Sequence, residues 1–189
     1  MEAFLVSTSV VALAEIGDKT QLLSLILAAR FRKPLPIVFG ILVATLLNHA
    51  MAGALGAWLA TLLTPQTLAW IMGISFIAMG LWILVPDKLD ESDVALPQKK
   101  IGVFFATLFA FFLAEMGDKT QFATIALGAQ YPSILMVVLG TTLGMMLANV
   151  PAVYLGHRFA DRLPTKLVHS IAAVIFVAIG LWTLAKMLF

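Results

Sequence analysis

Long apolar runs dominate this chain and limit what it can fold into. A helix needs about 20 residues to cross a hydrocarbon core about 30 Å thick. Six runs are long enough, and they cover residues 3–29, 34–63, 67–85, 102–130, 132–160 and 165–188. Only 12% of the residues are charged, whereas a soluble domain carries about 25%. We therefore expect an all-α integral membrane protein with six transmembrane helices.

The connections between the runs are short, with one exception. The segments 30–34, 64–66, 130–133 and 161–166 are turn-like, and 86–100 is long, polar and typical of a flexible linker. The basic residues are spread thinly between apolar runs, so they indicate membrane topology and no nucleic-acid partner. The absence of cysteine excludes disulfides, thiolate metal sites and cysteine nucleophiles.

The two halves of the chain repeat each other at an offset of 100 residues. Residues 15–21 match 115–121, Gly40 matches Gly140, and residues 80–82 match 180–182. This predicts a first three-helix repeat over 1–85, a cytoplasmic linker over 86–101 and a second repeat over 102–189. Because each repeat has three spans, the second enters the membrane from the opposite face, which makes the repeats inverted.

The distribution of Lys and Arg predicts the orientation. With alternating spans, nine of them fall on one side and only Lys186 on the other. Basic residues favour the cytoplasmic side, so both termini are expected outside. Inverted-repeat transporters commonly bind their substrate near the midplane, where the repeats meet.

One polar block interrupts each half. EIGDKTQ fills 15–21 and EMGDKTQ fills 115–121, both inside apolar runs. A helix rises about 1.5 Å per residue, so each block falls near mid-bilayer and the two lie at equal depth. A charge there costs at least about 2.5 kcal/mol, so the blocks are expected to face each other, water or a bound cation.

Two local geometries are open for each block. On a continuous helix, Glu15, Asp18 and Lys19 share one face and Thr20 points away. Alternatively the helix breaks at Gly17, with Asp18 and Gln21 forming a capping box, and the same break repeats at Gly117. A broken helix would free backbone carbonyls as additional ligands.

The block residues suggest a hard divalent cation as the ligand. Four carboxylates and two lysines leave a formal charge of −2, which a divalent cation would cancel. Oxygen ligands suit Mg²⁺, Ca²⁺ and Mn²⁺ better than Zn²⁺ or Cu²⁺. The candidate metal ligands are Glu15, Asp18, Glu115 and Asp118, and the supporting residues are Thr20, Gln21, Thr120, Gln121, Lys19 and Lys119.

A purely structural interpretation is also open. A Glu15–Lys19 pair one turn apart, with Asp18 spent as a helix cap, would make the block a kink without a ligand. The lysines either hold the carboxylates when the site is empty or extend toward the membrane surface. His49 and its counterpart Asn149 are polar near mid-membrane; either is a proton or polar partner of the site, although a packing hydrogen bond is favoured.

The doubled motif carries a family resemblance. E-x-G-D-(K/R)-(T/S), present twice in a six-span chain, resembles the family once listed as uncharacterised protein family sixteen. That family includes Golgi manganese and calcium transporters and bacterial manganese exporters. The resemblance covers essentially the whole chain and is closest to the compact prokaryotic members. It implies export of Mn²⁺ across the cytoplasmic (inner) membrane in exchange for H⁺.

Other activities stay open at this point. Ca²⁺/H⁺ exchange would use the same site, and a divalent-cation channel would use the carboxylates as a selectivity ring. An intramembrane hydrolase is disfavoured because no nucleophile is evident, so the chain is expected not to be an enzyme. The sequence contains no nucleotide-binding motif, which argues against transport driven by ATP. The expected partners are a divalent cation, H⁺ and the lipid bilayer, and homo-oligomerisation is left open.

Overall fold

The computed structural model describes residues 1–85, 102–155 and 165–188, which are helical and contain no strand. The helices are α1 Glu2–Glu15, α2 Lys19–Phe31, α3 Pro34–Leu62, α4 Pro65–Ile83, α5 Val103–Glu115, α6 Lys119–Gln130, α7 Ile134–Leu155 and α9 Thr165–Leu188. Within the described ranges, α3, α4, α7 and residues 166–187 of α9 are long and apolar enough to cross a membrane. The prediction of an all-α chain with membrane-spanning helices is confirmed in these ranges. The count of six spans, the inverted repeats and the outward termini remain predictions, and the linker over 86–101 lies outside the described residues.

Two of the predicted spans are not continuous helices. The run 3–29 divides into α1 and α2, and the run 102–130 divides into α5 and α6. Both divisions fall inside the polar blocks. The expectation of one regular helix through each block is therefore wrong, and the alternative with a break at Gly17 and Gly117 is correct.

The other helix ends follow from local sequence. Pro34 and Pro65 begin α3 and α4, where a missing N–H leaves no bond unmade. Thr64 caps α4, because its hydroxyl accepts a hydrogen bond from the N–H of Thr67 at 3.2 Å. Arg32 closes α2 in the left-handed conformation, with φ of 53°. The predicted turns at 30–34 and 64–66 are thus confirmed.

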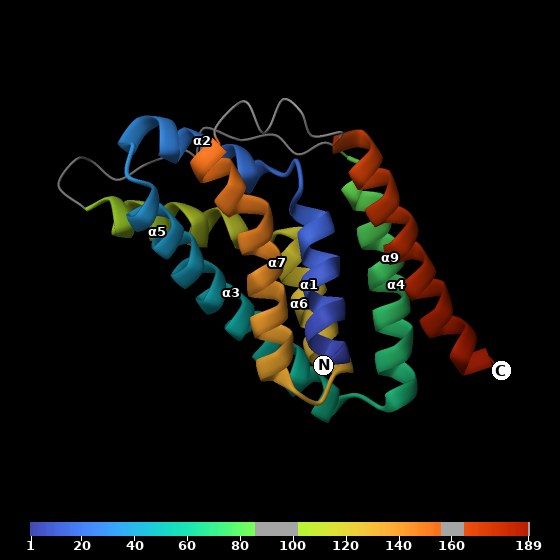
Figure 1. Cartoon of the computed structure of the whole chain (residues 1–189). Helices are drawn as coiled ribbons and strands as arrows, with labels where there is room; N and C mark the ends of the chain where they lie inside the picture. Colours follow the sequence, from blue (N-terminus) through green and yellow to red (C-terminus); the bar gives the residue numbers. More distant parts are fainter. Residues whose placement is uncertain (86–101, 156–164, 189) are drawn as a thin grey trace.

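The helices pack across the two halves of the chain. Figure 1 shows α4 and α9 side by side, next to a group formed by α1, α3, α6 and α7. In that group α1 packs on α7 and α6 packs on α3. The neighbouring helix α5 also packs on α3. The first half thus contributes α1 and α3, and each takes its main partner from the second half.

Close helix contact depends on glycines at matching positions. A Cβ at Gly140 would lie 2.5 Å from the carbonyl oxygen of Phe4 in α1. A Cβ at Gly40 would lie 2.8 Å from the carbonyl oxygen of Phe104, next to α5 residue Thr107. A larger residue at either position would push the helices apart, so these contacts set how closely α7 approaches α1 and α3 approaches α5.

Two apolar clusters pack on either side of the polar blocks. One joins Val10 and Leu127 to the aromatic pair Phe76 and Phe176, whose ring centroids are 5.9 Å apart. The other contains counterparts of the first, including Ala110 and Leu27. Each cluster buries the apolar faces of the half-helices. Ala14 and Ala114, the residues that precede the polar blocks, belong to these clusters, so apolar packing begins directly beside each block.

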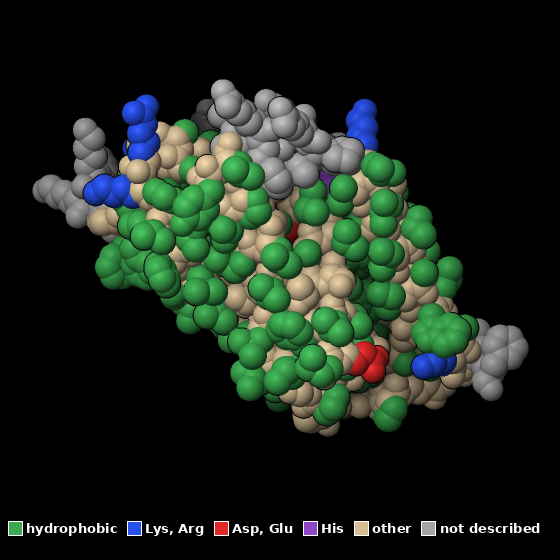
Figure 2. Space-filling model, viewed as in Figure 1, with side chains coloured by type: hydrophobic (Ala, Val, Ile, Leu, Met, Phe, Trp, Pro, Cys, Tyr) green, Lys and Arg blue, Asp and Glu red, His purple; other side chains and the backbone are tan. Residues whose placement is uncertain are grey.

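Basic side chains gather at one edge of the molecule. Figure 2 shows them along the edge where α2 ends and α9 begins, as located in Figure 1. Arg30 lies in the last turn of α2, Lys33 directly precedes α3, and Lys186 lies near the other end of α9. This distribution is the one that the orientation prediction requires.

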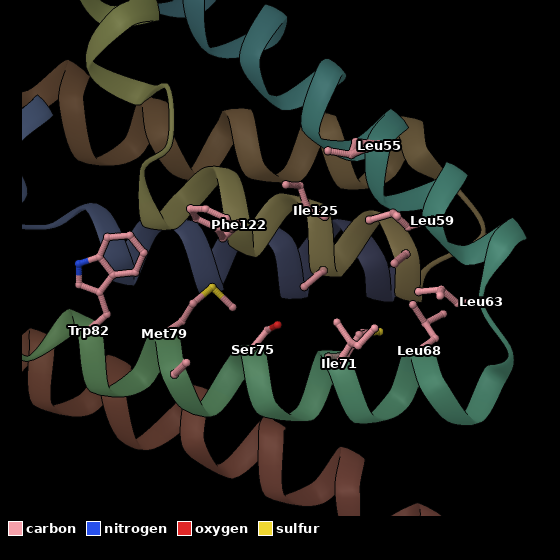
Figure 3. Close-up of a pocket in the computed structure, with 14 residues that line it drawn as sticks. Leu55, Leu59, Leu63, Leu68, Ile71, Ser75, Met79, Trp82, Phe122 and Ile125 are labelled. Atoms are coloured by element: carbon pink, nitrogen blue, oxygen red, sulfur yellow. The ribbon is translucent and has the colours of Figure 1, made fainter.

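An apolar groove runs between α4 and the helices α3 and α6 (Figure 3). Its volume is about 580 Å³, and its lining includes Leu55, Phe122 and Met79. Ser75 supplies the one side-chain hydroxyl among the described lining residues. A groove of this chemistry offers no ligand set for a cation, so the candidate site has to be sought at the polar blocks.

Candidate metal centre

Each polar block breaks its helix by the same local device. Gly17 and Gly117 have φ of 86° and 77°, a conformation that glycine adopts without steric cost. The next residue, Asp18 or Asp118, is extended and becomes the N-cap of the following half-helix. The sequence Gly-Asp therefore turns the chain and starts a new helix within two residues.

The glutamines of the blocks stabilise these breaks. The N–H of Gly17 donates to Oε1 of Gln21 at 2.9 Å, and the N–H of Gly117 donates to Oε1 of Gln121 at 2.8 Å. The predicted capping box is therefore not formed as expected, because each glutamine binds the glycine N–H and not that of the aspartate, and Asp18 supplies no side-chain cap to α2. The cap by Asp118 is a weak contact of 3.4 Å to the N–H of Thr120.

The lysines connect the two blocks. Nζ of Lys119 forms an ion pair with Oδ1 of Asp18, and Nζ of Lys19 lies 3.4 Å from Oδ1 of Asp118. The first pair is buried, with 2% of the Lys119 side chain exposed, and the second is more open, with 18% of Lys19 exposed. The two blocks, which repeat each other at an offset of 100 residues, therefore face each other, as the sequence predicts.

Three carboxylates converge between the blocks. Glu15, Glu115 and Asp118 each offer one oxygen, and these oxygens all lie within 4.8 Å of one another. All three residues are buried. Oxygens at this spacing from both halves of the chain could hold one cation, which would also offset the repulsion between the carboxylates.

Threonine hydroxyls orient the two glutamates. Oγ1 of Thr20 donates to Oε2 of Glu15 at 2.6 Å, and Oγ1 of Thr120 donates to Oε2 of Glu115 at 3.0 Å. The other oxygen of each glutamate, Oε1, has no hydrogen-bond donor among the described residues. Each glutamate is thus fixed through one oxygen and keeps the other for a ligand.

The helix ends add to the electrostatics. Glu15 and Glu115 are the last residues of α1 and α5, so the negative ends of both helix dipoles point toward the carboxylates. With four carboxylates and two lysines, the formal charge of the blocks is −2. The net negative charge favours a cation over an anion, whereas the negative ends of α1 and α5 are offset by the positive ends of α2 and α6, which begin at the same breaks.

The predicted site residues come together with three differences. Thr20 does not point away, because the break turns it back onto Glu15. The pair that Lys19 forms is with Asp118 and not with Glu15. Asp18 lies outside the three-carboxylate group and pairs with Lys119. All three differences follow from the break, because helical spacing rules hold only along a continuous helix.

The two polar counterparts at 49 and 149 have different surroundings. Asn149 accepts a hydrogen bond from Ser24 at 2.8 Å and donates to the carbonyl of Met145, so its side chain takes part in helix packing, and its role as a proton or polar partner stays a prediction. His49 is buried, and neither ring nitrogen has a hydrogen-bond partner among the described residues. The favoured packing hydrogen bond is therefore not observed for His49, and its role as a proton or polar partner stays a prediction.

Two contacts of the site escape sequence reasoning. The amide of Gln21 donates to the carbonyl of Ala148 at 2.9 Å and ties the first block to α7. Nε2 of His169 lies 2.6 Å from the carbonyl oxygen of Ile16, inside the first break. No pattern identifies a backbone acceptor, although His169 stands out as a polar residue whose counterpart at the same offset is Ala69.

Comparison with known proteins agrees with this geometry. The family model described as "Divalent cation/proton antiporter GDT1" matches residues 3–91 and 103–188. A Vibrio cholerae serotype O1 protein named "Putative manganese exporter" is 51% identical over 184 residues, which cover 97% of this chain and 90% of that protein.

Plant relatives match over most of the chain as well. "GDT1-like protein 5" of Arabidopsis thaliana is 28% identical over 220 residues, covering 97% of this chain and 96% of that protein. "GDT1-like protein 4" of Oryza sativa subsp. indica is 26% identical over 204 residues, covering 95% and 72%. No solved structure matches this chain. The family match extends over both halves, and the chain belongs to the GDT1 family of divalent cation/proton antiporters.

Proposed function

We propose that this protein exports Mn²⁺ from the cytoplasm in exchange for H⁺, across the cytoplasmic (inner) membrane. The observation that carries the proposal is the group of three buried carboxylates, Glu15, Glu115 and Asp118, drawn from both halves of the chain. Hard oxygen ligands are those that Mn²⁺ prefers. The Vibrio cholerae relative bears the name of a manganese exporter, which supports the choice of ion.

Each residue of the blocks has a role in this proposal. Glu15, Glu115 and Asp118 bind the ion, and the threonines hold the glutamates in place. Lys19 and Lys119 neutralise the aspartates while no ion is bound. When Mn²⁺ arrives it displaces a lysine, and Asp18 becomes available as a fourth ligand. The lysines then act as exchangeable counter-charges.

Proton coupling follows from competition at the same oxygens. A protonated carboxyl loses the charge that attracts Mn²⁺, so protons entering from outside would release the ion. The reverse exchange on the cytoplasmic side would discharge the protons and reload the site. Mn²⁺ and H⁺ would each favour the conformation of the protein that binds that ion better, which links the two fluxes.

An inverted repeat supplies the two conformations. We propose six spans, two of them broken, with the halves 1–85 and 102–189 related by inversion and both termini outside. The packing of α1 on α7 has its counterpart in α5 on α3, and that of α2 on α7 in α6 on α3. This exchange of partners supports the inverted arrangement.

Purified protein in liposomes tests the proposal. With a Mn²⁺-sensitive dye on one side, an imposed pH gradient should drive Mn²⁺ movement against its own gradient. Glu115→Gln should reduce the rate at least about 100-fold, because one ligand oxygen and its charge are lost. Glu2→Gln is the matched control, since Glu2 is exposed at the start of α1 and should behave like the parent.

The same assay separates the alternatives. Ca²⁺ in place of Mn²⁺ tests Ca²⁺/H⁺ exchange, for which the oxygen ligands are equally suited. A channel would pass the ion only down its gradient and would not respond to pH in this way. A Mn²⁺ flux that ignores the pH gradient, or a Glu115→Gln variant with the parent rate, would refute the exchange mechanism proposed here.

A further inference from the structure

One hydrogen bond joins the last helix to the first helix break. Nε2 of His169 in α9 lies 2.6 Å from the carbonyl oxygen of Ile16. A carbonyl can only accept, so Nε2 carries the hydrogen and donates it. Ile16 directly follows Glu15 and is extended, with φ of −65° and ψ of 114°, so its carbonyl has left the α1 hydrogen-bond pattern. His169 thus binds a carbonyl group that is available as an acceptor only because the helix is broken.

No side chain among the described residues makes an equivalent contact at the second break, which lies between α5 and α6. The counterpart of His169 is Ala69, which has no side-chain hydrogen to donate. Ile16 and Gly17 are half-buried, whereas Gly117 is exposed and Met116 is 50% exposed. Two breaks with nearly the same sequence therefore have different surroundings, and the difference coincides with His169.

The packing of α9 shows the same asymmetry. Ala172, one turn after His169, is fully buried in the apolar cluster that contains Val10 and Ala14 of α1. α9 packs on α1, and α4 packs on α6. Exchanging the two halves of the chain would turn these contacts into α5 with α4 and α2 with α9. Among the described helices, neither of those two pairs packs to a comparable extent. The α4–α9 pair thus lies against one of two equivalent sets of half-helices.

We infer that His169 is a positioning residue for the transport cycle, an inference that rests on the proposed function. Its bond holds the Ile16 carbonyl and fixes the end of α1, directly after Glu15. In the opposite conformation α9 leaves α1 and the bond is broken. His169 therefore stabilises one of the two conformations, and the Ala69 side lacks such a contact.

Cysteine accessibility tests this inference, because the chain has no cysteine of its own. Ala172→Cys places a single thiol in the buried α9–α1 contact, where it reacts with a maleimide only when α9 has moved away. Adding His169→Ala should raise the labelling rate about fivefold, the effect of losing one hydrogen bond. Adding His169→Gln, which keeps a hydrogen-bond donor, should leave the labelling rate within about twofold of that of Ala172→Cys alone.

Transport measurements separate positioning from loss of structure. His169→Ala should lower the maximal Mn²⁺ rate about fivefold and change KM by less than about twofold, because the bond does not touch the ion. Ser170→Ala is the matched control, since this exposed hydroxyl bonds only the carbonyl of Lys166 in its own helix. Ser170→Ala should leave the labelling rate of Ala172→Cys and the Mn²⁺ transport of the parent unchanged.

The outcomes distinguish the two proposals. Equal labelling of Ala172→Cys with and without His169→Ala, with Mn²⁺ transport intact, would overturn the role of His169 alone. His169→Gln behaving like His169→Ala would overturn the role of the hydrogen bond. A parent that moves no Mn²⁺ while the labelling difference persists would overturn the proposed function and leave the α9–α1 contact in place.

Discussion

At the scale of single residues, the repeated block assigns one task to each residue type. Glutamate ends a half-helix, glycine supplies the left-handed turn, aspartate caps the next half-helix, and lysine pairs with the other block. The lysines are the clearest case, because a charge in a buried place needs a partner of opposite sign. The two ion pairs use the same residue types but differ in burial, which makes their contributions separable.

Replacing Lys119 tests the buried pair. Lys119→Met should lower the melting temperature of the metal-free protein by about 5–10 °C, since breaking a buried ion pair costs about 3–5 kcal/mol. Lys19→Met should lower it by less than about 3 °C, because the second pair is longer and more exposed. Thermal denaturation in detergent measures both. Equal losses in the two variants would contradict this assignment, and Mn²⁺ should restore part of the loss in Lys119→Met.

The sequence predicts these residues better than their pairing. The motif, its duplication and the glycine breaks are readable because each depends on local chemistry or on repetition. The crossing of Lys19 to Asp118 and the inward turn of Thr20 are not, because spacing rules describe a continuous helix. The bond of His169 to a backbone carbonyl leaves no trace in sequence at all.

At the scale of helices, the broken runs explain how polar groups are tolerated inside an apolar segment. Each break brings the C-terminal end of one half-helix and the N-terminal end of the next to the same place. Run length and hydropathy predict where a span lies but not whether it is continuous. The glycine and aspartate of each block predict that the span is broken. This prediction is strong only because the same residues recur in the second block.

Glycine conformation gives a test at this scale. Gly117→Ala should destabilise the protein by about 1–2 kcal/mol, because φ of 77° is unfavourable for a residue with a Cβ. No atom lies within 4 Å of the added Cβ, so the effect is conformational and not steric. Gly117→Asn should lose less, since asparagine tolerates this conformation.

The matched control for this substitution is Gly102→Ala. A Cβ there also meets no atom within 4 Å, but φ is −58°, which any residue adopts. Thermal denaturation should therefore leave Gly102→Ala close to the parent. A Gly117→Ala variant as stable as Gly102→Ala would show that the left-handed turn is absent in the folded protein.

At the scale of the whole molecule, duplication predicts two equivalent halves, but the α4–α9 pair packs on α1 and α6. A repeat sequence describes both of two symmetry-related arrangements equally well, so it cannot indicate which one the chain adopts. His169 and Ala69 are among the positions where the halves differ. The placement of α9 was therefore not predictable from the repeat, whereas the meeting of the two blocks was.

Inversion itself predicts that positions 100 residues apart label from opposite sides of the membrane. Lys33 and Ser133 are such a pair, both exposed and both next to the start of a long helix. In this cysteine-free chain, Ser133→Cys should react with an impermeant maleimide in intact cells, and Lys33→Cys only after permeabilisation. The basic side chains near Lys33 predict a cytoplasmic location for it by the positive-inside rule. Reaction of both cysteines from the same side would mean parallel repeats, and the two broken helices would then not approach the metal centre from opposite faces.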